Sequence, residues 1–171
     1  MWEGKNVTVF VTGGIAAFKA ATLVRLFVKA GANVEVAMTK SACEFITPLT
    51  FQVLTKNKVH TDTFDEDEAD LVQHIHLADK TDVAVVVPAT ANTIAKLANG
   101  IADNFVTSTL LATTAPIYVA PAMNEHMWEN PATVRNVAQL KADGKVIIEP
   151  TTGFLAEGYN GKGRLPEPEE I

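Results

Sequence analysis

Short apolar runs alternate along the chain with longer segments of helical periodicity. The apolar runs are rich in Val, Ile and Ala, which favours β-strands; they cover residues 6–11, 33–38, 82–87, 116–120 and 145–148. Between and after these runs, apolar side chains recur at the spacing of one helix face. The predicted helices cover residues 15–29, 40–54 with an interruption at Pro48, 91–97, 105–112 and 131–142. This order predicts parallel strands joined by helical crossovers.

The run at 82–87 lacks the polar alternation of a strand with one face in water. Such a strand is covered on both faces, as happens in parallel sheets with helices on either side. The sequence therefore predicts an α/β fold: a doubly wound, flavodoxin-like or Rossmann-like parallel sheet with helices on both faces. With 171 residues, the chain is of a length that suits a single domain.

The segment from Thr151 onward has a different composition, because Gly and Pro recur throughout it. Glycine and proline at this density favour turns and loops. We expect the compact domain to cover residues 1–152. Residues 153–171 are expected to form a mobile loop that acts as a flap, followed by the start of a linker.

Charge and composition exclude several classes of function. The net charge is −6, and no cluster of Lys and Arg is long enough to follow a nucleic-acid backbone. No stretch reaches the roughly 18 apolar residues of a membrane-spanning helix, and no signal peptide is visible at the start. Cys43 is the single cysteine, so no disulfide within the chain is expected. We therefore expect a cytoplasmic protein that binds neither nucleic acid nor membrane.

Polar and small residues follow four of the predicted strands directly. These segments cover residues 12–15, 39–41, 88–92 and 121–124. In open parallel sheets, ligands bind outside the carboxyl ends of the strands. The four segments are therefore expected to meet at one ligand site.

Gly13 and Gly14 stand where a strand enters a helix. They fit either a structural turn or a phosphate cradle, since glycine allows close approach and a helix N-terminus attracts anions. The hydroxyls of Thr39, Ser41 and Thr90 favour the cradle. The pattern is neither a dinucleotide fingerprint nor a Walker A loop.

Two asparagines and two histidines are further candidates for the site. Asn92 and Asn124 each follow a strand, where an asparagine can cap a helix or hold a carboxylate. His74 and His76 lie two residues apart and so do not share a helix face. No metal site is expected, although one histidine could act as a general acid or base.

Three motifs at these positions closely resemble those of phosphopantothenoylcysteine decarboxylases, which belong to the homo-oligomeric flavin-containing Cys decarboxylases. The motifs are Pro-Ala-Thr-Ala-Asn-Thr at 88–93, Pro-Ala-Met-Asn-Glu-His-Met-Trp at 121–128, and Gly-Phe-Leu-Ala-Glu-Gly at 153–158 followed by Gly-Lys-Gly-Arg at 161–164. The resemblance runs from Lys5 to about Glu170. It is strongest to the N-terminal half of a bifunctional bacterial enzyme that also carries a phosphopantothenate–cysteine ligase half.

The resemblance implies an enzyme, a carboxy-lyase of coenzyme A biosynthesis. It would use FMN to convert 4′-phosphopantothenoylcysteine into 4′-phosphopantetheine through thioaldehyde and enethiol intermediates. The residues that would hold FMN are Gly13, Gly14, Ile15, Thr39, Thr50, Pro88, Ala89, Thr90, Asn92 and Thr107. The residues that would bind substrate are Asn124, Met127, Gly153, Ala156, Lys162 and Arg164.

The resemblance also assigns catalytic roles and shows one departure. His74 would handle protons, and Asn124 would grip the substrate carboxylate. The family usually carries Ala-Cys-Gly in the flap, where its cysteine donates the last proton, whereas this chain reads Ala156-Glu157-Gly158. Three explanations are open: Glu157 takes the catalytic role, the reaction stops at the enethiol, or the residue was changed to stall the reaction.

Two other functions remain open beside this one. The chain could decarboxylate the C-terminal cysteine of a peptide and stop at the enethiol, or it could be a non-catalytic regulator with the same fold. A flavin prenyltransferase is a weaker choice. The family's flavin sites are completed by neighbouring subunits, which implies a homotrimer or a dodecamer, and a covalently linked ligase domain is a further expected partner.

Overall fold

The computed structural model describes residues 1–64 and 72–171. Its main feature is a parallel sheet of five strands. The strands are β1 (Asn6–Val11), β2 (Asn33–Met38), β3 (Val83–Ala89), β4 (Ile117–Pro121) and β5 (Val146–Ile147). Their spatial order is β2-β1-β3-β4-β5, and every neighbouring pair is parallel. The predicted doubly wound sheet is confirmed.

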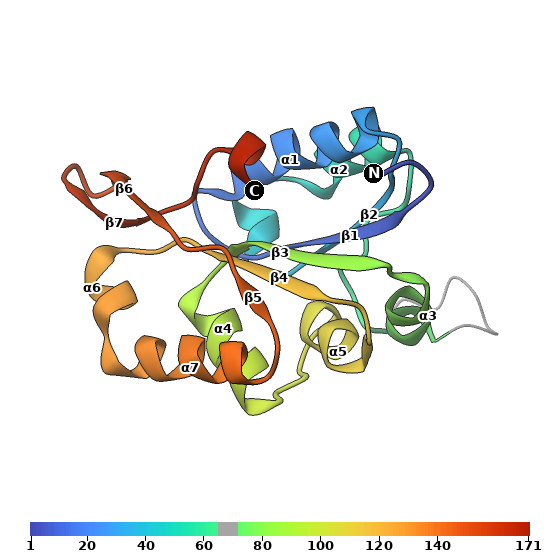
Figure 1. Ribbon diagram of the computed structural model, residues 1–171. Coiled ribbons are helices and arrows are strands. Elements are labelled where there is room, and N and C mark those ends of the chain that lie inside the picture. Colours follow the sequence, from blue (N-terminus) through green and yellow to red (C-terminus); the bar gives the residue numbers. More distant parts are fainter. Residues whose placement is uncertain (65–71) are drawn as a thin grey trace.

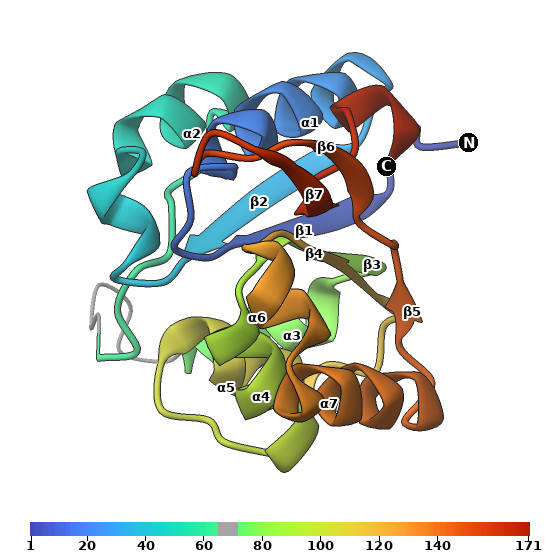
Figure 2. The same cartoon turned by 90° about the vertical axis from the view of Figure 1, so that its left-hand side faces the viewer.

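Helices cover both faces of the sheet (Figure 1; Figure 2). One face carries α1 (Ala17–Lys29), η1 (Ala42–Glu44), α2 (Pro48–Thr55) and η2 (Pro168–Glu170). The other carries α3 (Gln73–Lys80), α4 (Ala91–Asn99), α5 (Phe105–Ala112) and α7 (Pro131–Ala142). The short α6 (Glu125–Glu129) lies at the end of the sheet, before α7.

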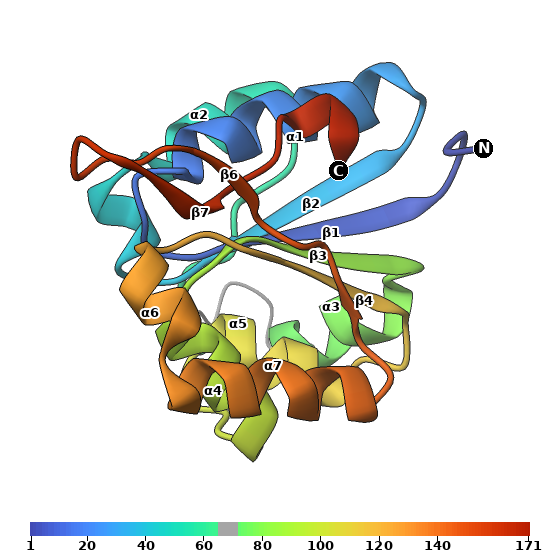
Figure 3. The ribbon, with the colours of Figure 1, turned by 60° about the vertical axis from the view of Figure 1, so that its left-hand side comes forward.

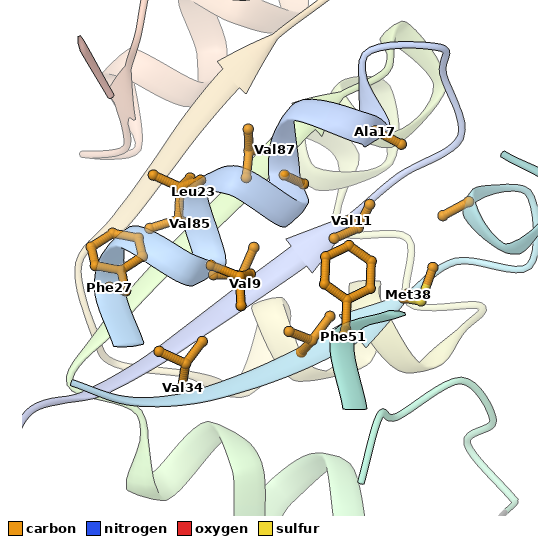
Figure 4. Close-up of a cluster of buried hydrophobic side chains, with 14 of the residues drawn as sticks. Val9, Val11, Ala17, Leu23, Phe27, Val34, Met38, Phe51, Val85 and Val87 are labelled. Atoms are coloured by element: carbon orange, nitrogen blue, oxygen red, sulfur yellow. The ribbon is translucent and has the colours of Figure 1, made fainter. Parts of the chain in front are cut away.

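The two cores are separated by the alternation of side chains along the strands. Val9 and Val11 of β1 are buried under α1 and α2, while Phe10 is buried on the opposite face. Figure 4 shows Phe27 of α1 and Phe51 of α2 packed against this first core. Complete burial of such a side chain contributes about 1.5–3 kcal/mol to the stability of the fold. Apolar packing on both faces therefore stabilises the sheet between its two layers of helices.

Outside the tail, the predicted elements agree with the structure except at three places. β3 continues through Pro88 and Ala89, with a register shift between Val86 and Ala89, where a proline without an N–H is tolerated. Neither α3 nor α6 was expected from the sequence pattern. Each has eight residues or fewer, and the two together bury only Leu77 and Ala78, so their apolar pattern is weak.

The glycine-rich tail forms a β-hairpin, which corrects the prediction that this segment has no regular secondary structure. β6 (Thr151–Phe154) pairs antiparallel with β7 (Asn160–Arg164), and the pair projects beside the sheet (Figure 3). Leu155 and Leu165 are buried, and Leu165 belongs to the core under α1. The hairpin also begins at residue 151, so the expected boundary between 152 and 153 falls inside β6.

A charged cluster joins edge strand β2 to the segments beside it. Glu35 of β2 accepts hydrogen bonds from the Nζ of Lys80 and, at 2.9 Å, from the ring of His60, whose other side stacks on Phe105. Burial by itself would raise the pKa of Glu35. The hydrogen bonds from His60 and Lys80 outweigh burial and hold this pKa below its ordinary value of 4.5.

We predict that this cluster stabilises the fold at neutral pH and not in acid. Since the folded pKa of Glu35 is lowered, its contribution is present above the unfolded pKa and is lost as the pH falls through the folded pKa. Glu35→Gln should lower the free energy of unfolding by about 1–3 kcal/mol at pH 7. Urea unfolding at pH 7 and again well below pH 4.5 should show the difference from wild type shrinking in acid.

Glu149→Gln is the matched control for this prediction. Glu149 pairs with Lys141 at 3.1 Å, and about half of each side chain is exposed, so the loss should stay within roughly 0.5 kcal/mol. A Glu35→Gln protein that is as stable as wild type at pH 7 would contradict the prediction.

The strand order brings the expected ligand-binding segments together. The chain runs from β1 outward to β2, then returns to β3 on the other side of β1 and continues to β4. The ends of β1 and β3 therefore part at the point where the order reverses, which is where ligands enter sheets of this kind.

Candidate functional site

A cavity of about 570 Å³ lies at the carboxyl ends of the central strands. Its walls come from the β1–α1 connection, the start of α4, the segment between β4 and α6, and the β6–β7 hairpin. Nine residues named from the sequence line it: Gly13, Gly14, Ile15, Thr90, Asn124, Met127, Ala156, Glu157 and Arg164. Three of the four predicted segments, together with the hairpin, therefore meet in one site.

The first wall is the turn at Gly13 and Gly14 before α1. A Cβ on Gly13 would collide with the side chain of Ser41, so this glycine lets the turn pack against the loop after β2. A Cβ on Gly14 would meet nothing within 4 Å. Among the described residues, no side chain caps α1 and no acidic residue lies in its first turn. This helix end is thus open to an anion from the cavity.

Thr12 was not singled out from the sequence, yet it holds two walls of the cavity together. Its buried hydroxyl donates to the carbonyl of Pro88 at 2.5 Å and accepts from the backbone N–H of Thr90 at 3.0 Å. The Thr90 hydroxyl in turn accepts from the N–H of Thr93 and caps α4. A threonine directly before two glycines was the available signal.

Asn124 projects from the segment after β4. Its Oδ1 accepts from the N–H of His126 at 2.8 Å and caps α6, which turns its Nδ2 toward the hairpin. That Nδ2 donates to the hydroxyl of Tyr159 at 2.7 Å and to Oε1 of Glu157 at 3.2 Å. Tyr159 is a second residue that the sequence analysis did not name.

The hairpin closes the cavity through a close approach of backbone to backbone. Gly163 has a φ of 141°, and a Cβ there would collide with the carbonyl oxygen of Met123. The Met123 N–H donates to the Gly163 carbonyl at 3.0 Å. Glycine is therefore required at this position for the flap to reach the segment that carries Asn124.

Two cations line the cavity and share one carboxylate. Lys19, on the first turn of α1, donates to the Leu165 carbonyl at 2.9 Å and to Glu167 at 3.0 Å. Arg164 donates to the same Glu167 oxygen at 2.9 Å. The hydrogen bond from Lys19 holds the pKa of Glu167 below its ordinary value. Lys19 was missed in the sequence, although a lysine one turn into the helix after a glycine pair was a usable sign.

Other predicted site residues lie outside this cavity. Pro88 and Ala89 are in β3, Asn92 is exposed on α4, and the Thr39 hydroxyl accepts from the N–H of Ala42. Thr107 is buried in a capping box with Asn104 and lines a separate small cavity. Thr50 lies on α2, and Gly153 and Lys162 lie on the hairpin away from the cavity wall.

His74 also lies away from the cavity of its own chain. It stands near the start of α3, with its ring edge against Phe105 at 6.4 Å between centroids. Its Nδ1 is buried and has no hydrogen-bond partner among the described residues. Buried polar atoms in proteins are nearly always hydrogen-bonded, so the missing partner of this Nδ1 needs an explanation.

The described part of the chain contains neither a metal-ion cluster nor a membrane-spanning helix. Within residues 1–64 and 72–171, no group of three or more His, Cys, Asp or Glu side chains is arranged to hold a metal ion. No helix in the same described part of the chain is long and apolar enough to cross a membrane.

The chain is similar to known proteins along its whole length. The family model described as flavoprotein matches residues 1–171. Coenzyme A biosynthesis bifunctional protein CoaBC of Bacillus subtilis is 56% identical over 171 residues, which are all of this chain and 42% of that protein. The probable phosphopantothenoylcysteine decarboxylase of Streptococcus mutans is 46% identical over 169 residues, covering 98% of this chain and 94% of that protein.

Solved structures share the whole fold. A PPC decarboxylase mutant complexed with pantothenoylaminoethenethiol superposes with a TM-score of 0.85 at 36% identity, covering 98% of this chain and 93% of that one. The FMN-dependent cysteine decarboxylase SpaF gives a TM-score of 0.84 at 34% identity, covering 95% and 92%. The chain spans less than half the length of its CoaBC relatives. The family match along all 171 residues, and the similarity to a decarboxylase over nearly its full length, show that this chain belongs to the flavoprotein family that includes the phosphopantothenoylcysteine decarboxylases.

Proposed function

We propose that the chain is an FMN-dependent decarboxylase that converts 4′-phosphopantothenoylcysteine into 4′-phosphopantetheine in coenzyme A biosynthesis. One observation carries the proposal: a single cavity joins the open N-terminus of α1 to the amide of Asn124. The first feature suits a phosphate and the second suits a carboxylate. The names of the Streptococcus mutans relative and of the PPC decarboxylase structure support the same substrate.

The residues at the cavity fit FMN. The open space beside Gly14 leaves the backbone amides before α1 accessible to a phosphate, and Ile15, which is 62% exposed, adds an apolar wall. Thr90, at the end of β3, adds its backbone and its hydroxyl group to the cavity wall. When bound, FMN would supply the oxidation and re-reduction at the carbon that bears sulfur, which lets the carboxylate leave.

The remaining residues would orient the substrate and handle its charges. The Nδ2 of Asn124 would hold the carboxylate, and Met127 would pack against the adjoining apolar part of the substrate. Glu157 and Tyr159 come from the flap and face the same amide, so closure of the flap would shut water out. Arg164 and Lys19 add positive charge for the anionic substrate.

We also propose a homo-oligomer, a trimer or a dodecamer, whose sites form between copies. His74 does not line the cavity of its own chain, and its buried Nδ1 lacks a partner among the described residues. Exposed apolar side chains beside the cavity, on α2 and in the connection before α2 would pack against a second copy: Ile15, Phe18, Phe45, Leu49 and Val53. In the oligomer, His74 of one copy would act in proton transfer at the cavity of the next.

A ligase domain in the same polypeptide is a further proposed partner, because the CoaBC relatives are more than twice as long as the matched region. We propose the cytoplasm as the location, because a single cysteine that forms no disulfide within the chain suits a reducing compartment.

The presence of Glu157 in the flap supports a second outcome, in which the reaction stops at the enethiol. The side chain of Glu157 is exposed in the structure, and a carboxyl group needs burial to become an effective proton donor near neutral pH. A peptide ending in cysteine is the matching alternative substrate.

Anaerobic single-turnover mass spectrometry of the FMN-loaded protein tests these proposals. A product of 4′-phosphopantothenoylcysteine that is lighter by carbon dioxide alone would support complete turnover. A product that also lacks two hydrogens, with FMN left reduced, would support arrest at the enethiol. Absence of any product, with FMN bound at full stoichiometry, would overturn the proposed substrate, and a cysteine-ended peptide would then be tried in its place.

A further inference from the structure

Both N–H donors of the Asn124 amide are occupied by the protein's own groups. Its Oδ1 accepts from the N–H of His126, and its Nδ2 has two hydrogens, which point to Glu157 and Tyr159. A ligand carboxylate therefore cannot take a hydrogen bond from this Nδ2 unless one of the two flap groups leaves.

Glu157 is the group that resembles such a ligand. It is a carboxylate that lines the same cavity and accepts from the Nδ2 at 3.2 Å, a longer contact than the 2.7 Å to the Tyr159 hydroxyl. The two cations that line the cavity, Lys19 and Arg164, are both bound to Glu167. Within the described residues Glu157 forms no ion pair, so little besides Asn124 retains its carboxylate.

The backbone at this point of the flap suits an exchange. Glu157 stands next to Gly158, which has a φ of 93°, in the turn between β6 and β7. The side chains of Glu157 and Tyr159 are both exposed, whereas Leu155 beside them is buried and anchors the turn. Glu157 can thus swing away from Asn124 by side-chain rotation while the hairpin stays in place.

We propose that Glu157 is a built-in competitor for the carboxylate subsite at Asn124, so that it occupies the amide in the empty site and is displaced by the carboxylate of the substrate. This inference rests on the proposed function, in which Asn124 holds that carboxylate. Two carboxylates so close together repel each other, so entry of the substrate drives Glu157 off the amide. Once carbon dioxide has left, Glu157 returns to Asn124 and nothing holds the product at this end of the cavity. Glu157 is therefore a positioning residue that sets how strongly the site prefers substrate over product.

The test compares two unreactive probes that differ only in the carboxylate. 4′-Phosphopantothenoyl-L-alanine carries it, and 4′-phosphopantothenoyl-ethylamine lacks it; neither has a thiol, so neither can be oxidised at the carbon that bears sulfur in the substrate. Their dissociation constants would be measured by titration calorimetry on the FMN-loaded wild-type protein and on variants with equal FMN content. A purely structural role of Glu157 would change both constants alike.

Glu157→Ala should tighten binding of the carboxylate probe by about three- to tenfold, the range expected when one competing hydrogen bond is removed. The ethylamine probe should keep its affinity within about twofold. Glu157→Gln, which keeps the acceptor but removes the charge, should show a smaller gain. Glu169→Ala removes an equally charged exposed group outside the cavity wall, and should change neither affinity.

Two results would overturn the inference. One is an unchanged or weaker affinity of Glu157→Ala for the carboxylate probe, and the other is an equal change for both probes. Asn124→Ala separates this failure from failure of the proposed function, because it should remove the preference of the protein for the carboxylate probe. If the preference survives in Asn124→Ala, or if wild type binds neither probe, the proposed function itself is wrong and this inference falls with it.

Discussion

Asn124→Ala is expected to lower kcat/KM for decarboxylation by about a thousandfold or more, a loss of about 4 kcal/mol of transition-state stabilisation. The amide is the polar group on the β4–α6 segment that faces the hairpin across the cavity, through contacts of 2.7 and 3.2 Å. Without it, a carboxylate has no fixed orientation relative to the flavin, and misorientation is costly in a positioned reaction. Binding of FMN should persist, because the turn before α1 and the start of α4 are untouched. Carbon dioxide release measures the loss of decarboxylation, and the flavin absorbance of the purified protein measures the retention of FMN.

Asn130→Ala is the matched control for this variant. Asn130 caps α7 as Asn124 caps α6: its Oδ1 accepts from the N–H of Ala132 at 2.9 Å, and its side chain lies outside the cavity. Each variant loses a helix cap, which costs roughly 1 kcal/mol of stability, but one of the two also loses the amide at the cavity. Full activity in Asn124→Ala, or equal loss in both variants, would refute the carboxylate-holding role.

Mixing two inactive variants is expected to restore activity. If His74 serves the cavity of a neighbouring copy, His74→Ala and Asn124→Ala each inactivate every site of a uniform oligomer. In a random mixed oligomer, about a quarter of the sites take an intact His74 from one copy and an intact Asn124 from another. Co-expression of the two variants with different affinity tags, followed by purification through both tags, removes the uniform oligomers. The mixed oligomers should therefore have roughly a quarter to a third of wild-type activity, the higher value applying to trimers.

The controls for this experiment are each single variant expressed alone, and the double variant that carries both substitutions, expressed with both tags. All three should stay inactive. Activity that remains absent in the mixed oligomer, while size-exclusion chromatography with light scattering shows that it has formed, would mean that His74 does not act across copies. A monodisperse monomer that retains FMN at micromolar concentration would contradict the oligomer as well.

The pattern of strands and helices along the sequence was enough to predict most of the fold. Apolar runs without polar alternation could be recognised as strands buried on both faces, because they are short, rich in β-branched residues and bounded by turn residues. The turn after β1 and the segments after β3 and β4 could be assigned to one site for a general reason: the carboxyl ends of parallel strands meet at the same edge. The motif resemblance then supplied the family, which the match over residues 1–171 confirms.

The tail shows where the pattern failed. Six residues of Gly or Pro after position 152 read as a loop, yet residues 151–164 contain a hairpin. Its strands are specified less by their own side chains than by what they touch. Leu155 and Leu165 are buried, and Gly163 allows its backbone to meet that of Met123. Contacts between distant parts of the chain outweigh local propensity in such a segment.

The sequence by itself determined the parallel sheet, the helices that alternate with its strands, and the edge at which ligands would bind. These features follow from local periodicity and from the chirality of parallel crossovers. Only the tertiary structure decided which side chains share the cavity. It brought Asn124 against Glu157 and Tyr159, which lie 33 and 35 residues away, and left His74 outside the cavity on another helix. Hydrogen bonds of this kind depend on the angle and distance at which folded elements meet, and no spacing along the chain encodes either one.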